Sequence, residues 1–198
     1  DGTELVSGDI DVTALSVFDV RGLGITQATS RRAVIAMLQA AYMFDYVPRS
    51  GELTAIVRGA TASVTLTDDE LGAHIDGSEP PPIWSISRSP GNALPDMVEV
   101  TFVDPDHNYE AATQSARRQA SDGGTVRRVS MSLAMSNDDG AQIADTLLHL
   151  AHIESEEYRS VTMPSTIDDV QPGEVLSATV DGVDYTFRAI QASIIDGR

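Results

Sequence analysis

The chain has 198 residues, room for one large domain or two small ones, with 41% apolar and 22% charged residues, as in an ordinary soluble protein. Thirty acidic residues oppose thirteen basic ones, all arginine, so the formal net charge is −17. Such a chain repels phosphate backbones and anionic lipids, which excludes nucleic-acid binding through a basic surface and adsorption to an anionic membrane. The absence of cysteine excludes disulfides, thiol nucleophiles and zinc–thiolate sites.

The N-terminal sequence carries no targeting signal of the secretory type. Residues 1–11 are acidic and lack both the basic start and the apolar centre of a signal peptide. Apolar runs along the chain are only a few residues long, too short for a membrane-spanning helix. Because the sequence does not begin with Met, we expect a processed chain or a piece of a longer one.

Two helices are predicted from apolar residues that recur with helical periodicity. The first covers residues 30–44 with Ser30 as its N-cap. Its apolar stripe consists of Ala33, Val34, Met37, Leu38, Ala41 and Tyr42. The second covers residues 137–152 and begins with two aspartates, which suit the positive end of a helix dipole. Gly140, within its first turn, weakens the second prediction slightly.

Most of the remaining chain alternates between apolar and polar residues, which predicts strands. The expected strands cover residues 44–49, 53–58, 83–88, 97–103, 126–135, 175–180 and 183–190. Two pairs of them form hairpins, one around Gly51 and one around Asp181 and Gly182, the strongest short turn signal in the chain. We therefore expect an α+β fold in which strands dominate and two amphipathic helices pack on them.

Two stretches rich in Pro, Gly, Ser or Asp interrupt the strands, at residues 76–82 and 120–125. The first is expected to belong to a linker. On this interpretation, residues 1–75 form an N-terminal helix-and-hairpin part, residues 76–93 form the Pro-rich linker, and residues 94–198 form a second strand-rich part with one helix.

One segment begins like a calcium loop, with oxygen-bearing side chains at alternate positions, Asp104, Asp106 and Asn108. An EF-hand requires Gly at the sixth position and Glu at the twelfth, where this chain has Tyr109 and Ser115. A tight turn with local hydrogen bonds is therefore favoured over a metal site. No metal and no cofactor are expected.

Other residues with catalytic or ligating chemistry are scattered. His149 and His152 have a spacing that suits a metal, but a solvated His149 and a helix-end His152 are the simpler interpretation. Glu154, Glu156 and Glu157 lie close by and are expected to form charged surface. The serines lack a G-x-S-x-G elbow and the glycines lack a phosphate-binding pattern, so no catalytic residue is predicted.

Six of the thirteen arginines form three adjacent pairs, namely Arg31, Arg32, Arg117, Arg118, Arg127 and Arg128. Arginine binds carboxylates with a planar, bidentate geometry, so in an acidic chain such pairs suit contacts across a subunit interface. Salt bridges within the chain are the alternative, and each would be weak at the surface. We take the six as candidate interface residues.

Several stretches follow one another in a characteristic order along residues 10–190. The first is a helix followed by a hairpin that ends in Arg-Gly. The second is a Leu-Pro pair before an alternating strand with Asp and Tyr, and Ala-Arg-Arg follows it. The last is a Pro-Gly turn before a strand. The positions concerned include Arg58, Gly59, Leu94, Pro95, Asp104, Tyr109, Pro172 and Gly173. Together they resemble the phage-type tail hub proteins, which include the tail-hub region of gene transfer agents and siphophage tail-tip proteins. Glu174 departs from the Asp that commonly follows Pro-Gly, and the hydrolase-like barrel of the largest members is absent.

The resemblance implies a non-enzymatic structural protein, a trimeric hub at the tail tip or baseplate of the virion. Each subunit would contribute two tube-forming, β-barrel-like domains, which join a sixfold tail tube to a threefold tip. Implied partners are other copies of the chain, the distal tail protein, the tail tube, and tail fibre or tip proteins. DNA would pass through the lumen without specific binding, and acidic residues would suit that lumen. Assembly would take place in the bacterial cytoplasm, without a membrane anchor.

Two functions of other classes remain open. One is a tail-associated cell-wall hydrolase fragment, for which Glu154, Glu156 and Glu157 are the candidate carboxylates. The other is a receptor-binding module, in which the loops at residues 76–82 and 119–125 would face the host.

Overall fold

The structure is a computed structural model that describes residues 7–25, 28–49, 51–59, 61–74, 77, 79, 82–87, 94–119, 124–156, 158–163 and 170–191. The chain divides into two compact units, each assembled from segments that are far apart in the sequence. Unit 1 comprises Asp1–Val17, Met43–Ile86 and Arg159–Arg198, and unit 2 comprises Phe18–Tyr42 and Ser87–Tyr158.

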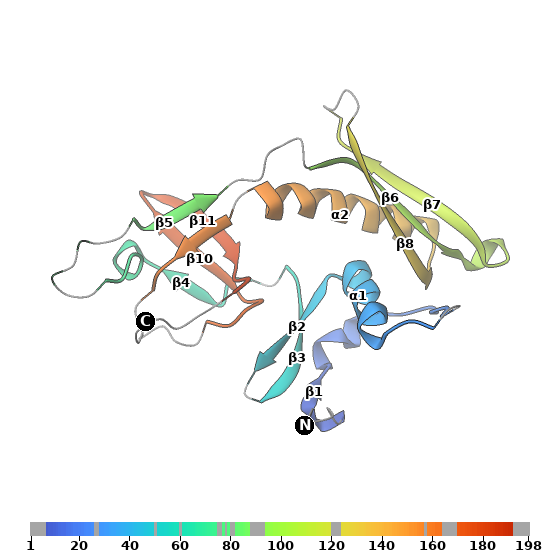
Figure 1. The fold of residues 1–198 in the computed structure, drawn as a ribbon, viewed down its shortest axis with the longest axis horizontal. Coiled ribbons are helices and arrows are strands. Elements are labelled where there is room, and N and C mark those ends of the chain that lie inside the picture. Colours follow the sequence, from blue (N-terminus) through green and yellow to red (C-terminus); the bar gives the residue numbers. More distant parts are fainter. Residues whose placement is uncertain are drawn as a thin grey trace. The chain divides into compact units, whose positions relative to one another are not determined.

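Unit 2 contains a three-stranded sheet in the order β7–β6–β8 (Figure 1). Its strands are β6 (Pro95–Asp104), β7 (Glu110–Arg117) and β8 (Thr125–Ala134). β6 pairs antiparallel with β7 and parallel with β8. The backbone of Leu23 forms an antiparallel bridge with Leu133, so a short stretch of chain covers the other edge of β8. Within the described residues, the outer edge of β7 has no partner strand.

Helix α2 (Asn137–Glu156) lies along β6 and β7 and covers one face of the sheet (Figure 1). Val98, Val100 and Phe102 alternate along β6, and each is at most 1% exposed, because one face of the strand packs under the helix. Gly140 lies over Phe102 so closely that a Cβ there would be 2.3 Å from Phe102 Cε1. This close packing explains a glycine in the first turn of the helix.

Helix α1 (Arg31–Tyr42) packs near β8 in the same unit. Ser30 begins the helix, since its hydroxyl oxygen accepts a hydrogen bond from the Ala33 N–H at 3.2 Å. The Ser132 N–H donates to Met37 Sδ at 3.2 Å, which ties the helix to the strand. The rings of Phe18 and Tyr42 contact each other at the end of the helix, with centroids 5.2 Å apart and planes tilted by 46°.

Unit 1 contains two three-stranded sheets, ordered β1–β3–β2 and β11–β10–β4, and a two-stranded sheet, β5–β9. The strands of the first are β1 (Ile10–Asp11), β2 (Phe44–Arg49) and β3 (Glu52–Val57). Those of the second are β4 (Val64–Leu66), β10 (Val175–Val180) and β11 (Val183–Arg188). The two-stranded sheet consists of β5 (Trp84–Ser87) and β9 (Tyr158–Val161).

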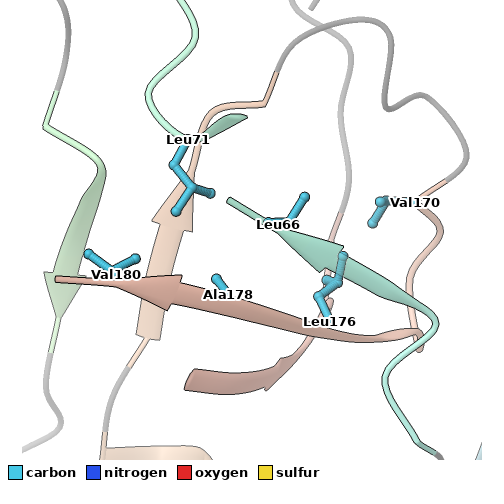
Figure 2. Close-up of a cluster of buried hydrophobic side chains, with 6 residues drawn as sticks. All are labelled: Leu66, Leu71, Val170, Leu176, Ala178 and Val180. Carbon is cyan, nitrogen blue, oxygen red and sulfur yellow. The ribbon is translucent and has the colours of Figure 1, made fainter. Parts of the chain in front are cut away.

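The core of unit 1 lies on one face of the β11–β10–β4 sheet. Figure 2 shows its buried side chains, Leu66, Leu71, Val170, Leu176, Ala178 and Val180. Three of them alternate along β10 and therefore share a face. Trp84 and Tyr185 pack against this cluster, with their rings edge to face at 4.8 Å between centroids. Burial of these apolar side chains is the main contribution to the stability of the packing on this face of the sheet.

The α+β fold dominated by strands is confirmed, and both predicted helices are present. The second hairpin is confirmed as well, since Asp181 and Gly182 have φ of 52° and 76°, as a tight two-residue turn requires. β1, β4, β7 and β9 were not expected from the sequence. The described strands form open sheets, in contrast to the closed barrels implied by the resemblance, because β7 and β11 end their sheets without a further partner among the described residues. Most of residues 76–82 and 120–125 lie outside the described residues.

Candidate functional site

The turn between β6 and β7 gathers its polar groups around the carboxylate of Asp104. This side chain ends β6 and is only 2% exposed. Its Oδ1 accepts a hydrogen bond from the Asp106 N–H at 2.9 Å. Its Oδ2 lies 2.7 Å from His107 Nδ1 and accepts from Asn137 Nδ2 at 3.0 Å. Since Asn137 begins α2, Asp104 joins the end of one strand, the turn and the start of the helix.

The local sequence explains the turn. Asp104 is the N-cap of a short 3-10 helix, Pro105–His107, in which proline suits the first position. Asn108 and Tyr109 then adopt left-handed backbone conformations, with φ of 54° and 60°, and so reverse the chain into β7. Asn tolerates this conformation well, whereas Tyr does so at a cost. Tyr109 is 69% exposed at the tip of the turn.

The charges of Asp104 and His107 stabilise each other. The hydrogen bond from His107 lowers the pKa of Asp104 from its ordinary value of 3.8, although loss of solvation acts in the opposite direction. The same hydrogen bond raises the pKa of His107 from its ordinary value of 6.5. A shallow pocket beside the pair is lined by Glu110, Ala111 and Asn137. Because three hydrogen-bond donors already engage the Asp104 carboxylate, these contacts stabilise the turn and its attachment to the start of α2.

The calcium-loop candidates do not gather their oxygens around one point that is free to bind. Asp104 uses both oxygens for hydrogen bonds within the chain, while Asp106 and Asn108 are exposed. Among the described residues, no group of three or more His, Asp or Glu side chains is placed to hold a metal ion. The side chains of Glu154 and Glu156, and Glu157 altogether, lie outside the described residues.

In unit 1, a second cluster centres on Asp45 in β2. Arg58 donates to its carboxylate from two of its three guanidinium nitrogens, Nε to Oδ2 at 2.7 Å and Nη2 to Oδ1 at 2.9 Å. Arg188, the last residue of β11, adds a contact from Nη1 to Oδ2 at 3.1 Å. The hydrogen bond from Arg58 lowers the pKa of Asp45 below 3.8. The three half-buried side chains join the hairpin β2–β3 to the second sheet of the unit.

The Pro-Gly turn before β10 contacts the same hairpin. Arg49, at the end of β2, donates from Nε to Gln171 Oε1 at 3.0 Å and forms an ion pair with Glu174. Gly173 has φ of 91°, and a Cβ there would meet Val47 Cγ1 at 3.3 Å. The turn therefore needs glycine both for its backbone conformation and for its close approach to β2.

The positions that carry the family resemblance thus fall into two places. Arg58, Gly59, Pro172 and Gly173 lie on the hairpin β2–β3 and the turn that contacts it, in unit 1. Leu94, Pro95, Asp104 and Tyr109 lie along β6 and its turn, in unit 2. The partners Asp45, Arg188 and Asn137 were not predicted from the sequence, because contacts between distant segments leave no local signal.

The six paired arginines differ in their contacts, and three of them interact with other groups of the chain. Arg118 Nη1 lies 2.9 Å from His152 Nδ1, while His152 Nε2 lies 2.8 Å from the carbonyl oxygen of Pro95. Arg128 forms an ion pair with Glu99 across β8 and β6 at 2.7 Å. Arg117, at the end of β7, also has an interaction.

The other three arginines of these pairs are Arg31, Arg32 and Arg127, and all three are exposed. Within the described part of the chain, none of them has a hydrogen bond or ion pair through its guanidinium group. As for membranes, no helix among the described residues is long and apolar enough to span one.

Solved structures of other proteins have a similar fold. A chain from the virion of a native gene transfer agent particle matches with a TM-score of 0.81 at 19% identity, over 93% of this chain and 41% of that one. The tail protein from Neisseria meningitidis MC58 matches with a TM-score of 0.52 at 15% identity, over 85% of this chain and 53% of that one. The present chain thus spans less than half of the gene transfer agent chain.

No curated protein matches the sequence. A family model does match it, with the description "Putative phage tail protein", over residues 30–191. This region includes both helices, the hairpin β2–β3, the Asp104 turn and the Pro-Gly turn. Because the match extends over most of the sequence, the chain belongs to this family of phage tail proteins.

Proposed function

We propose that this phage tail component is a subunit of a trimeric hub at the tail tip, which joins the tail tube to the tip. The observation that carries the proposal is the likeness over 93% of the chain to a chain of a gene transfer agent virion. The described residues also offer no metal-binding cluster, and their polar clusters are engaged in holding turns and strands together. A structural role fits these clusters better than a catalytic one.

The division of the chain into two compact units supports a threefold hub. Each unit contains a small sheet that ends in an unpaired edge strand among the described residues, β7 in unit 2 and β11 in unit 1. Three copies present six such units, which is the number that a sixfold tube requires. Unpaired edges favour association with further chains, and closed symmetry satisfies all of them at once.

The charge of the chain supports a place beside a DNA conduit. With a net charge of −17, the protein repels DNA and so allows it to pass without being held. The proposed partners are further copies of the chain, the distal tail protein, the tail tube, and tip or fibre proteins. Assembly would take place in the bacterial cytoplasm before the particle is complete.

Native mass spectrometry and light scattering of the purified chain test the trimer directly. We expect a species with three times the 21.1 kDa mass of the chain. A monomer at every concentration, up to the highest that remains soluble, contradicts the proposal. Electron microscopy of particles that carry a tagged copy tests the position. Density for the tag at the tip end of the tail supports a hub, whereas density along the tube contradicts it.

A further inference from the structure

The turn that joins β6 to β7 presents an exposed tyrosine at its tip (Figure 1). The side chain of Tyr109 is 69% exposed. Among the described residues, its hydroxyl forms no hydrogen bond and its ring contacts no other aromatic ring. Aromatic side chains stabilise a fold mainly through the area that they bury, and this one buries little. The packing of unit 2 therefore does not account for a tyrosine at this position.

The backbone at Tyr109 makes the presence of a tyrosine more unusual. With φ of 60°, it has a left-handed conformation that glycine adopts freely and that a bulky residue adopts at an energetic cost. Asn108, the residue before it, is left-handed as well, but asparagine tolerates this conformation. Strained residues of this kind cluster at functional sites. A contact outside the chain therefore explains a strained, exposed tyrosine better than the fold does.

The base of the turn is fixed, so the ring is presented from a rigid support. Asp104 is buried there and accepts hydrogen bonds from the Asp106 N–H and from Asn137, and it contacts His107 as well. These contacts attach the turn to both β6 and α2. A side chain on a preorganised turn loses little conformational freedom when it binds a partner. Tyrosine is also among the residues that contribute most to the affinity of protein–protein contacts.

The surroundings of Tyr109 indicate the kind of partner. We call residues 106–110 the tyrosine turn. Asp106 and Glu110 are exposed on either side of the tyrosine in the sequence, and residues 104–116 contain no arginine. Glu110 also lines a shallow hollow of about 290 Å³ together with Ala111, so the surface is partly apolar. Opposite charges across an interface favour association, so the partner that fits this turn is basic.

We propose that the tyrosine turn binds a basic surface on another protein of the particle, with Tyr109 inserted into an apolar pocket of that protein. A second copy of this chain fits the turn poorly, because the chain has a net charge of −17 and no lysine to place around such a pocket. The proposal rests on the proposed place of the chain among other tail proteins. It adds which surface of the chain one of those proteins contacts.

Tyr109→Gly separates binding from folding, because glycine removes the ring and relieves the left-handed backbone at the same time. We expect this variant to keep or raise the urea midpoint of the chain. We expect it to weaken binding to the partner by about 30-fold, as at an interface hot spot. Asn108→Gly is the matched control, because it changes the neighbouring exposed, left-handed residue and leaves the ring in place. Its affinity should change by less than about threefold.

The probes are the purified distal tail protein, tail tube protein and tip protein of the same particle. Biolayer interferometry measures the binding of each probe to the immobilised chain. Glu110→Gln tests the charge of the turn and is expected to slow association about threefold at low salt, with little change in dissociation. Glu52→Gln is its control, because it neutralises an exposed glutamate of the hairpin β2–β3 in unit 1, and it should leave both rates unchanged.

The outcomes separate this contact from the trimeric hub. Equal affinity of the wild-type chain and Y109G for the probe that binds contradicts the contact, and so does a wild-type chain that binds none of the three probes. If Y109G instead dissociates a trimer of the chain alone in native mass spectrometry, the turn binds a second copy and the proposed partner is wrong. The mass of the wild-type chain alone tests the hub, so a failed contact leaves the hub standing.

Discussion

The replacement Gly140→Ala tests the packing of α2 on the sheet of unit 2. An alanine Cβ at this position would lie 2.3 Å from Phe102 Cε1 and 2.9 Å from Cδ1 and Cζ. Carbon atoms in contact are normally separated by about 3.5–4.0 Å, so the ring or the helix must move by roughly 1 Å. Phe102 is 1% exposed, which leaves its ring little room to turn away.

Two effects of opposite sign determine the result. Alanine improves helix formation over glycine by about 1 kcal/mol. Insertion of a methyl group into a packed core costs about 1–3 kcal/mol, and a contact this short belongs at or above the upper end of that range. We therefore expect G140A to lower the free energy of unfolding by about 2 kcal/mol, from the difference between the two effects.

Urea denaturation followed by circular dichroism measures the change. Gly24→Ala is the control, since its Cβ would meet only the Ser132 carbonyl oxygen, at 3.8 Å, and we expect almost no effect. The variant F102L in the G140A background should recover part of the loss, with a coupling of about 1–2 kcal/mol in a double-mutant cycle. Stabilisation by G140A, as in a solvent-exposed helix, refutes the packing described for α2 and β6.

Two other changes test the polar clusters. Asp45→Asn removes the charge bound by Arg58 and Arg188, all three half-buried, and is expected to lower the free energy of unfolding by about 2 kcal/mol; calorimetry that shows no change contradicts the role given to this cluster. The pKa of His107 is raised by Asp104, so its contribution to stability is complete below pH 6.5 and is lost as the pH rises through the higher folded-state value. The wild-type chain should therefore lose stability above pH 6.5 relative to His107→Gln. Urea midpoints that change with pH by the same amount in the wild-type chain and in His107→Gln contradict this linkage.

Local patterns predicted the elements whose residues carry their own signal. Both helices have an apolar stripe, and the hairpin β10–β11 contains an Asp-Gly turn. β7 went unpredicted because its residues Glu110–Arg117 are mostly small and polar, with only Ala as apolar side chains. It becomes a strand through its pairing with β6, a contact that leaves no trace in its own composition.

The candidate site was predictable only in part, for the same reason. The sequence identified Asp104 and Arg58, but their partners Asn137 and Arg188 come from segments far along the chain. The paired arginines were equivalent in the sequence, and only the fold shows that Arg118 and Arg128 are engaged within unit 2. Gly140 weakened the helix prediction, although the structure shows that packing against Phe102 requires it.

Because positive charge is scarce in this chain, exposed arginines matter for the association of one copy with another. Arg49, Arg58 and Arg188 form ion pairs within unit 1, and Arg118 and Arg128 are engaged in unit 2, so at least five of the thirteen cations are used in internal contacts. Copies of a chain with a net charge of −17 repel one another wherever acid meets acid. Association is therefore favoured where a copy offers arginines that its own carboxylates do not engage, and among the described residues Arg31 and Arg32 meet this condition. Added salt screens both the general repulsion between copies and any attraction at these arginines, so the strength of association between copies must depend on ionic strength.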